Sequence, residues 1–400
     1  MPPTPITPTP RIVIYYQTHH NPSDAPLSIL PLLTAPNTQI THLILAAIHL
    51  NEPSASSPLS QPHITLNDHP PSHPRNQTLW AELSVLRASG IKVLGMLGGA
   101  AKGSFALLDT LSASAFETAY LPLHDLIRTR SLDGLDLDVE EPMSLQGIIR
   151  LIDRLKADFG PDFIITLAPV AAALLNPLSN LSGFDYAELE KQRGEKIAWY
   201  NTQFYCGWGD MYTTAMYDAI VWNGWTPSKV VVGLVTNPEN GSGWVPMLVL
   251  RLIFGRLRER YGALGFGGVM GWEYFNSLPG GRERPWEWAA FMTRVLRDST
   301  PDMLTEGERV EAEALVARRM EEVREARRKA EEESEARRKA AEDEEARKKS
   351  VIYLADGGDD AGEAGLPGAF EYFSDEDGND REDALLPRSF EYFTDESLEE

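Results

Sequence analysis

The stretch Asp133-Gly134-Leu135-Asp136-Leu137-Asp138-Val139-Glu140 alternates apolar and acidic side chains over its last six positions. Successive side chains of a β-strand point to opposite faces. The stretch therefore predicts a strand with one apolar face and one face that carries three carboxylates: Asp136, Asp138 and Glu140. A turn followed by the solvent-exposed face of an edge strand gives the same local pattern. The segments around the stretch decide between the two.

Seven further runs of apolar and β-branched residues resemble strands, and each precedes a polar loop and a helix-like segment: 11–17, 41–50, 91–99, 162–170, 196–205, 229–236 and 265–275. This order is typical of parallel α/β architecture. Eight strands match one (β/α)8 TIM barrel, which usually takes about 250 residues. An open doubly wound sheet, the alternative, would normally carry a glycine-rich turn after its first strand. Here THHNP (18–22) stands in that place, so we expect a barrel over residues 11–300.

The loops and the acids have predictable places in such a barrel. Residues 52–74 are rich in Pro and Ser, so we expect a long loop there, at the end of the barrel where loops line the site. Three unpaired carboxylates inside a barrel would be too costly for a structural strand, so they must share protons or bind a ligand. Glu140 ends the strand nearest the open mouth, which predicts a general acid.

DGLDLDVE (133–140) closely resembles the DGxDxDxE signature of glycoside hydrolase family 18, whose members include chitinases and endo-β-N-acetylglucosaminidases on a (β/α)8 barrel. The resemblance implies that Glu140 protonates the glycosidic oxygen. It also implies that Asp138 orients the 2-acetamido group of the substrate, whose oxygen attacks the anomeric carbon in place of an enzyme carboxylate. Asp136 would hold Asp138 and share its proton. Asp133 and Tyr15 join the residues expected to bind substrate.

Two later segments resemble other motifs of the same family. WYNTQFY (199–205) resembles the sixth-strand motif, which implies that the Tyr205 hydroxyl steadies the acetamido group and that Gln203 reaches the sugar. GGVMGWEYFNS (267–277) resembles the eighth-strand motif, which implies that Trp272 forms the apolar floor under the reacting sugar. Aromatic rings suit the apolar face of a sugar. Each aromatic residue alone would more often be a core residue, but three motifs in order favour a site.

One position departs from many chitinases, which carry Ser-x-Gly-Gly on the third strand where this chain has Met96-Leu97-Gly98-Gly99. The change removes a hydroxyl near the acids and leaves open how Asp136 is hydrogen-bonded. Residues 237–264 are also too few for the extra α+β insertion that many processive chitinases carry.

Longer runs over about residues 11–298 resemble fungal endo-β-N-acetylglucosaminidases that act on N-glycans, a subgroup in which that serine is also absent. The implied reaction is hydrolysis of the GlcNAc-β-1,4-GlcNAc bond of the N-glycan core, with N-glycans or free oligosaccharides as partners. A chitinase that cleaves β-1,4-GlcNAc polymers is the alternative. A non-catalytic chitin- or glycan-binding protein is disfavoured because the acid Glu140 and its companions Asp138, Asp136 and Tyr205 are all present.

The net charge of −22 is concentrated outside this region, since residues 301–400 hold 32 acids and 15 bases. Negative charge repels phosphate backbones and anionic bilayers, so we expect neither nucleic acid nor membrane as a partner. A ten-residue repeat, EARRKAEEES (325–334) and EARRKAAEDE (335–344), pairs charges at i,i+4 without an apolar seam, which predicts a charged single helix over 301–350. We expect an acidic, disordered tail over 351–400, which repeats FEYF[ST]DE. Aromatic residues within acidic runs are typical of motifs that bind a protein partner, and a solubilising tail is the alternative.

Other features of the sequence predict that metal sites, cofactors, disulfides and membrane spans are absent. The eight histidines have no known ligand spacing, so we expect no metal and no cofactor. Cys206 is the single cysteine, which excludes an intramolecular disulfide and reads as a packing residue. The proline-rich segment 1–10 lacks the basic and apolar regions of a secretory signal. No stretch is apolar enough to span a membrane, so we expect a cytoplasmic enzyme.

Overall fold

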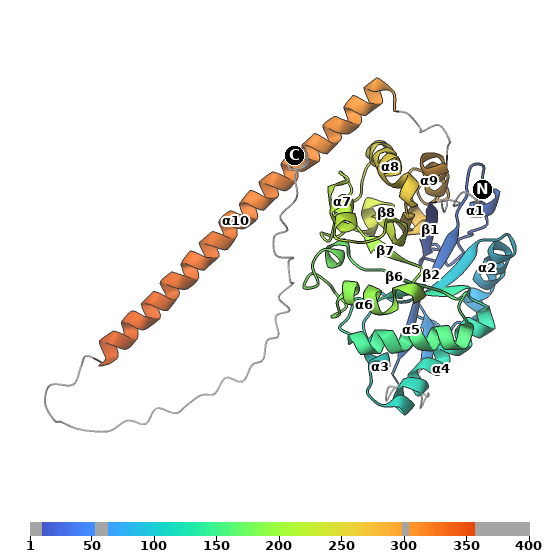
Figure 1. Ribbon diagram of the computed structural model, residues 1–400, viewed down its shortest axis with the longest axis horizontal. Helices are drawn as coiled ribbons and strands as arrows, with labels where there is room; N and C mark the ends of the chain where they lie inside the picture. The colour runs from blue at the N-terminus through green and yellow to red at the C-terminus, as the bar shows by residue number, and fades with distance from the viewer. Residues whose placement is uncertain (1–9, 53–62, 298–303, 357–400) are drawn as a thin grey trace, which may run out of the picture. The chain divides into compact units, whose positions relative to one another are not determined.

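The computed structural model describes residues 10–52, 63–297 and 304–356, with side chains up to residue 347. Its centre is a closed barrel of eight parallel strands (Figure 1): β1 (Arg11–Tyr16), β2 (His42–Asn51), β4 (Lys92–Gly98), β5 (Gly134–Asp138), β6 (Ile164–Leu167), β7 (Trp199–Gln203), β8 (Val230–Val235) and β9 (Gly268–Trp272). Neighbouring strands pair in chain order, and β1 pairs with both β2 and β9, which closes the barrel. All eight strand predictions and the (β/α)8 fold are confirmed.

Helices surround the barrel on the outside (Figure 1): α1 (Pro31–Thr34), α2 (Gln77–Ala88), α3 (Ser104–Leu108), α4 (Ala113–Arg130), α5 (Leu145–Phe159), α6 (Tyr186–Arg193), α7 (Ala215–Trp222), α8 (Met247–Tyr261) and α9 (Glu287–Arg297). Helix α5 illustrates their origin. The Ser144 hydroxyl caps its first turn by accepting a hydrogen bond from the Gly147 amide at 3.0 Å, and Gly160, at φ 86°, follows its last residue. Its apolar residues recur at helical spacing and are buried against the sheet.

The expected long loop over residues 52–74 is wrong in one part, because β3 (His63–Leu66) is a strand. It pairs antiparallel with Ile48–Asn51 of β2. The reason is that β2 outruns its parallel neighbour β1, whose last paired residue is Tyr16 opposite Leu45. β3 completes the edge of β2 that β1 leaves free, while the other edge of Ile48 still pairs with Leu97 of β4. An antiparallel strand pair thus extends the barrel rim.

The interior of the barrel is mostly apolar, and acidic side chains lie toward the carboxyl ends of its strands. A buried cluster of inward-facing residues fills the interior: Val13, Tyr15, Ile44, Ala46, Leu94, Met96, Trp199, Val231 and Met270. Asp136, on β5, is completely buried at the top of this cluster. Because active sites of such barrels lie at the carboxyl ends of the strands, the packed interior forms the floor of the site.

Helix α10 (Glu306–Asp356) confirms the predicted charged helix, and its first turns belong to the same compact unit as the barrel. Arg251 of α8 forms an ion pair with Glu308 at 2.8 Å, Arg256 forms one with Glu313 at 3.6 Å, and Ala312 is fully buried. The compact unit therefore extends to Ala314, beyond the expected boundary at residue 300.

From Leu315 onward, α10 is described by itself. Its side chains over residues 324–347 are exposed, and charge pairs at i,i+4 support the helix, such as Arg327 with Glu331 at 2.9 Å. None of the helices in the described ranges is long and apolar enough to cross a bilayer. The acidic tail predicted for 351–400 lies outside the described residues from position 357 on.

Removal of residues 315–400 is expected to leave kcat/KM and the thermal unfolding midpoint of the barrel unchanged. Removal of residues 304–400 is expected to lower the unfolding midpoint, because it uncovers the surface on which Ala312 is buried and leaves Arg251 without Glu308. Calorimetric melting of both truncated forms beside the full chain checks this. Equal unfolding midpoints for the two truncated forms would contradict the boundary of the compact unit at Ala314.

Candidate active site

Three carboxylates leave the barrel interior along one face of β5 and its continuation. Asp136 is fully buried and Asp138 is 6% exposed, while Glu140 lies two residues beyond the end of the strand and is partly exposed. This is the row that the alternation of the sequence predicts. The row runs from the core to the open end of the barrel.

Asp136 accepts three hydrogen bonds inside the barrel. The donors are the Tyr15 hydroxyl at 2.6 Å, the Thr166 hydroxyl at 2.6 Å and the Asn201 side-chain amide at 3.0 Å. The Trp199 indole N–H in turn donates to the Asn201 oxygen at 2.8 Å. Burial raises the pKa of Asp136, and these three hydrogen bonds oppose that rise. The structure thus shows what holds Asp136 although Met96 replaces a serine on the neighbouring strand.

Asp138 and Glu140 share one amide donor. The Gln203 Nε2 lies 3.2 Å from Asp138 Oδ1 and 3.3 Å from Glu140 Oε1, and it also donates to the Ala168 carbonyl at 2.9 Å. Burial, followed by the charges of Glu140 and Asp136, raises the pKa of Asp138 well above its ordinary value. Burial also raises the pKa of Glu140, and the Gln203 hydrogen bond opposes this. A proton is therefore retained in this pair at a higher pH than in a free carboxylic acid.

A cavity of about 470 Å³ opens above these acids. Asp138, Glu140, Gln203, Tyr205 and Trp272 all line it, so five of the predicted site residues meet around one space. Its volume lies within the usual range for small-molecule sites. Burial, and then the charge of Asp138, raises the pKa of Tyr205 well above its ordinary value, so its phenol stays protonated and able to donate.

Two predicted substrate-binding residues lie elsewhere. Asp133 stands at the amino end of β5, where it accepts a hydrogen bond from the Val93 amide at 2.9 Å and pairs with Arg87 at 3.2 Å. Its prediction is wrong, because the opposite end of the strand faces the cavity. Tyr15 is 1% exposed and lies beneath the cavity with its hydroxyl on Asp136. It positions an acid and is not among the residues that line the cavity.

Glu141, directly after the predicted acid, has a positioning role that sequence reasoning missed. It is 5% exposed, and its two carboxylate oxygens accept hydrogen bonds from the Gly103 and Phe105 amides at 2.8 Å each. These bonds hold the loop after β4, whose residues 99–101 line the cavity. Glu140 thus lines the cavity, and the adjacent Glu141 holds one of the loops around it. The sequence alone does not show which of the two glutamates has which role.

Glu141→Gln is expected to raise KM and lower stability with little effect on kcat. A glutamine offers one oxygen to two amides and turns its own N–H toward the other, which costs about 1–3 kcal/mol of folding free energy. Chemical denaturation and steady-state kinetics check both effects, with Glu117→Gln, a 44% exposed side chain on α4, as control. A loss confined to kcat would contradict the loop-positioning role.

Comparison with known proteins places these features in context. No model of a known protein family matches the chain. The structure of a fungal endo-β-N-acetylglucosaminidase from glycosyl hydrolase family 18 is 51% identical, with a TM-score of 0.68, and the match covers 72% of this chain and 98% of that one. The structure of chitinase ChiC from Aspergillus fumigatus is 56% identical, with a TM-score of 0.63, and the match covers 71% and 98%.

A curated relative is more distant. Chitinase 2 of Rhizopus oligosporus is 27% identical over an alignment of 215 residues, and the match covers 48% of this chain and 36% of that protein. The chain therefore matches little more than a third of that relative's length. The two solved structures, in contrast, are matched over almost their whole length.

Proposed function

Because the chain belongs to glycoside hydrolase family 18, we propose that it is an endo-β-N-acetylglucosaminidase that hydrolyses the GlcNAc-β-1,4-GlcNAc bond of N-glycan cores. One observation carries the chemistry: Glu140 and Asp138 meet Tyr205 and Trp272 around a single cavity at the carboxyl end of the barrel. The 51% identity with a fungal endo-β-N-acetylglucosaminidase supports the choice of bond.

In the proposed reaction, Glu140 gives its proton to the glycosidic oxygen as the bond from that oxygen to the anomeric carbon breaks. The carbonyl oxygen of the substrate's own 2-acetamido group attacks the anomeric carbon, and a cyclic oxazolinium ion forms. Asp138 accepts the hydrogen bond of the acetamido N–H and balances the positive charge. Water then attacks the anomeric carbon, Glu140 takes back a proton, and the product retains its configuration.

The surroundings of the acids fit these roles. The pKa of Glu140 is raised by burial, which keeps the proton available to the leaving group. Tyr205, with its pKa raised, can donate to the acetamido oxygen in the cavity. Trp272 contributes a ring to the cavity wall that suits the apolar face of a sugar.

A chitinase is the second candidate. It is supported by the 56% identity with the structure of ChiC from Aspergillus fumigatus and by the similarity to Chitinase 2 of Rhizopus oligosporus. Both reactions place the same acetamido sugar beside Glu140, so the acids alone do not separate the two.

A mixed digest tests the proposal. The protein is incubated with a high-mannose glycopeptide and chitin hexamer together, and the masses of the products are measured by mass spectrometry. We expect the glycopeptide to retain one GlcNAc on its asparagine. Cleavage of chitin alone would replace the proposal by the second candidate, and no cleavage of either substrate would point to a glycan-binding protein.

A further inference from the structure

Glu273, directly after Trp272, is a buried carboxylic acid that the proposed reaction does not use. It is 7% exposed and is not among the described residues that line the catalytic cavity. Burial raises the pKa of Glu273, and hydrogen bonds from Thr18 and Gln17 oppose this rise. Because burial of a carboxylate is costly, the contacts that hold it indicate what the group does.

The contacts of the Glu273 carboxylate are with the segment after β1. Its Oε2 accepts hydrogen bonds from the Gln17 amide at 3.0 Å and the Thr18 amide at 2.8 Å, and its Oε1 accepts one from the Thr18 hydroxyl at 2.8 Å. The last residue pair between β1 and β9 is Ile14 with Gly271. The carboxylate therefore joins the two chain segments where the ladder of paired residues stops, and it satisfies two backbone amides there.

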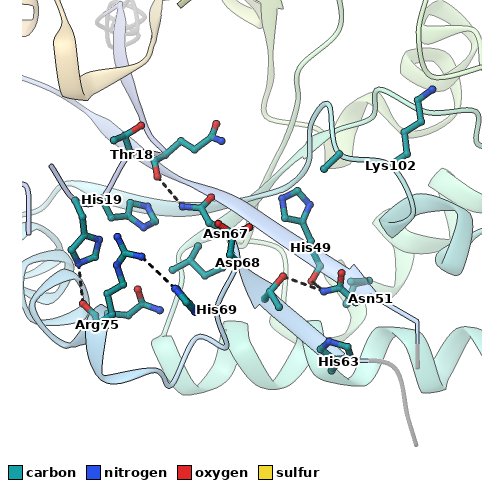
Figure 2. Close-up of a pocket in the computed structure, with 17 residues that line it drawn as sticks. Thr18, His19, His49, Asn51, His63, Asn67, Asp68, His69, Arg75 and Lys102 are labelled. Atoms are coloured by element: carbon teal, nitrogen blue, oxygen red, sulfur yellow. Dashed lines mark hydrogen bonds between the residues drawn. The ribbon is translucent and has the colours of Figure 1, made fainter. Parts of the chain in front are cut away.

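The segment after β1 is also held by Asn67. The Asn67 side chain donates to the Gln17 carbonyl at 2.9 Å, and Thr18 and Asn67 lie near one another in the wall of an adjacent cavity of about 730 Å³ (Figure 2). Gln17 lines both this cavity and the catalytic cavity. Glu273 and Asn67 thus fix the backbone of a residue in the wall of the catalytic cavity.

The backbone that carries Trp272 and Glu273 is fixed by residues at and beyond the end of β8. The Thr236 amide donates to the Trp272 carbonyl at 2.8 Å, and the Thr236 hydroxyl donates to the Glu273 carbonyl at 2.7 Å. The Asn240 side chain donates to the Trp272 carbonyl at 3.2 Å. The Trp272 ring meets Tyr15 edge-on, with ring centroids 5.5 Å apart. The Glu273 carboxylate therefore extends from a fixed backbone toward the segment after β1.

We propose that Glu273 is a positioning residue whose carboxylate holds the segment after β1 against β9 and thereby fixes the spacing between Gln17 and Trp272 in the wall of the catalytic cavity. This inference rests on the proposed function, in which Trp272 contacts the reacting sugar. Without the carboxylate, the Gln17 and Thr18 amides lose their acceptor, and the segment shifts to find another. A wall that is no longer held in advance binds the sugar more weakly, so the loss falls on KM.

Three substitutions of Glu273 separate the reach of the side chain from its charge. Glu273→Met keeps the length without an oxygen acceptor, and Glu273→Asp keeps the charge but is one methylene shorter. Glu273→Gln can keep all three contacts, because its oxygen can accept from both amides while its NH₂ group donates to the Thr18 hydroxyl. We expect KM to rise about tenfold in the Met and Asp variants with kcat within about threefold, and KM of the Gln variant to stay within about twofold of the wild type.

Glu82→Met is the matched control. The Glu82 carboxylate accepts hydrogen bonds from the Ser28 hydroxyl at 2.9 Å and the Ile29 amide at 2.8 Å, which are the same kinds of donor. None of these three residues is among those that line the two cavities. Glu82→Met should lower the thermal unfolding midpoint, as Glu273→Met does, but leave KM unchanged.

Fluorine NMR of protein labelled with fluorotryptophan reports on Trp272 without a substrate. The chain has nine tryptophans, and the signal that disappears in Trp272→Phe belongs to Trp272. We expect this signal to shift in Glu273→Met, because the neighbouring carboxylate no longer holds the cavity wall. It should keep its position in Glu273→Gln and in Glu82→Met.

Each outcome decides the inference, with kinetics measured on whichever of the glycopeptide and chitin hexamer the wild type cleaves. An unchanged KM in Glu273→Met, an equal rise in Glu273→Gln or Glu82→Met, or a loss confined to kcat would overturn it. If Glu273→Met does not fold, Glu273→Asp takes its place. If the wild type cleaves neither substrate, the proposed function fails and the Trp272 signal alone decides: a shift that Glu273→Gln does not share supports the inference, and an unshifted signal overturns it.

Discussion

Glu140→Gln is expected to reduce kcat by about 10³- to 10⁴-fold on any substrate that the protein hydrolyses. The glutamine keeps the size of the side chain and can still meet Gln203, but it holds no proton that it can give to a leaving oxygen. A loss of this size corresponds to about 4–5.5 kcal/mol in the activation barrier. KM should change little, because Trp272 and Tyr205, the proposed substrate contacts, still line the cavity. Steady-state kinetics with purified protein check both parameters.

The fold of the Glu140→Gln protein is expected to be as stable as the wild type or more stable at pH 7. The folded-state pKa of Glu140 is raised by burial, so ionisation of this group disfavours the folded state above the ordinary pKa of glutamic acid. The substitution removes that penalty. Thermal melting at pH 5 and pH 7 measures the effect, with the exposed Glu195→Gln as control. Turnover retained within tenfold of the wild type would show that another group is the acid.

The barrel could be predicted because its signal is repeated and local. Eight apolar runs, each followed by a helix-like segment, define eight strands whatever the exact boundaries are. The strand β3 could not be predicted in the same way. His63–Leu66 has four residues in a Pro- and Ser-rich surrounding, and it forms a strand because β2 outruns β1 and leaves an edge unpaired.

The row of acids could be predicted from alternation, and alternation also explains why the prediction of Asp133 failed. Position 133 is odd, so Asp133 belongs to the face of Leu135 and Leu137, and it lies at the far end of the strand. The partners of Asp136 are non-local. Thr166 is its register neighbour on β6, and Tyr15 and Asn201 come from β1 and β7. Only barrel closure brings these strands together.

Asp138→Asn is expected to lower kcat by about 10²- to 10³-fold, because the neutral amide would no longer balance the charge of the oxazolinium ion in the proposed reaction. It should also change the pH dependence. The charge of Glu140 raises the pKa of Asp138, and repulsion between two carboxylates acts on both of them. Removal of the Asp138 carboxylate therefore removes a repulsion that opposes full ionisation of the pair. Glu140 then loses its proton at lower pH, and the basic limb of the kcat/KM profile moves toward lower pH.

Gln203→Met is the matched control for the direction in which the pH profile moves. The Gln203 amide donates to both carboxylates, and its hydrogen bond lowers the pKa of Glu140 against the effect of burial. Loss of that bond raises the pKa of Glu140, so the basic limb should move toward higher pH, opposite to its movement in Asp138→Asn. Profiles of kcat/KM against pH for the two variants and the wild type measure both shifts. Movement of the basic limb in the same direction in both variants would mean that Asp138 and Gln203 do not control the pKa of Glu140 in the way inferred.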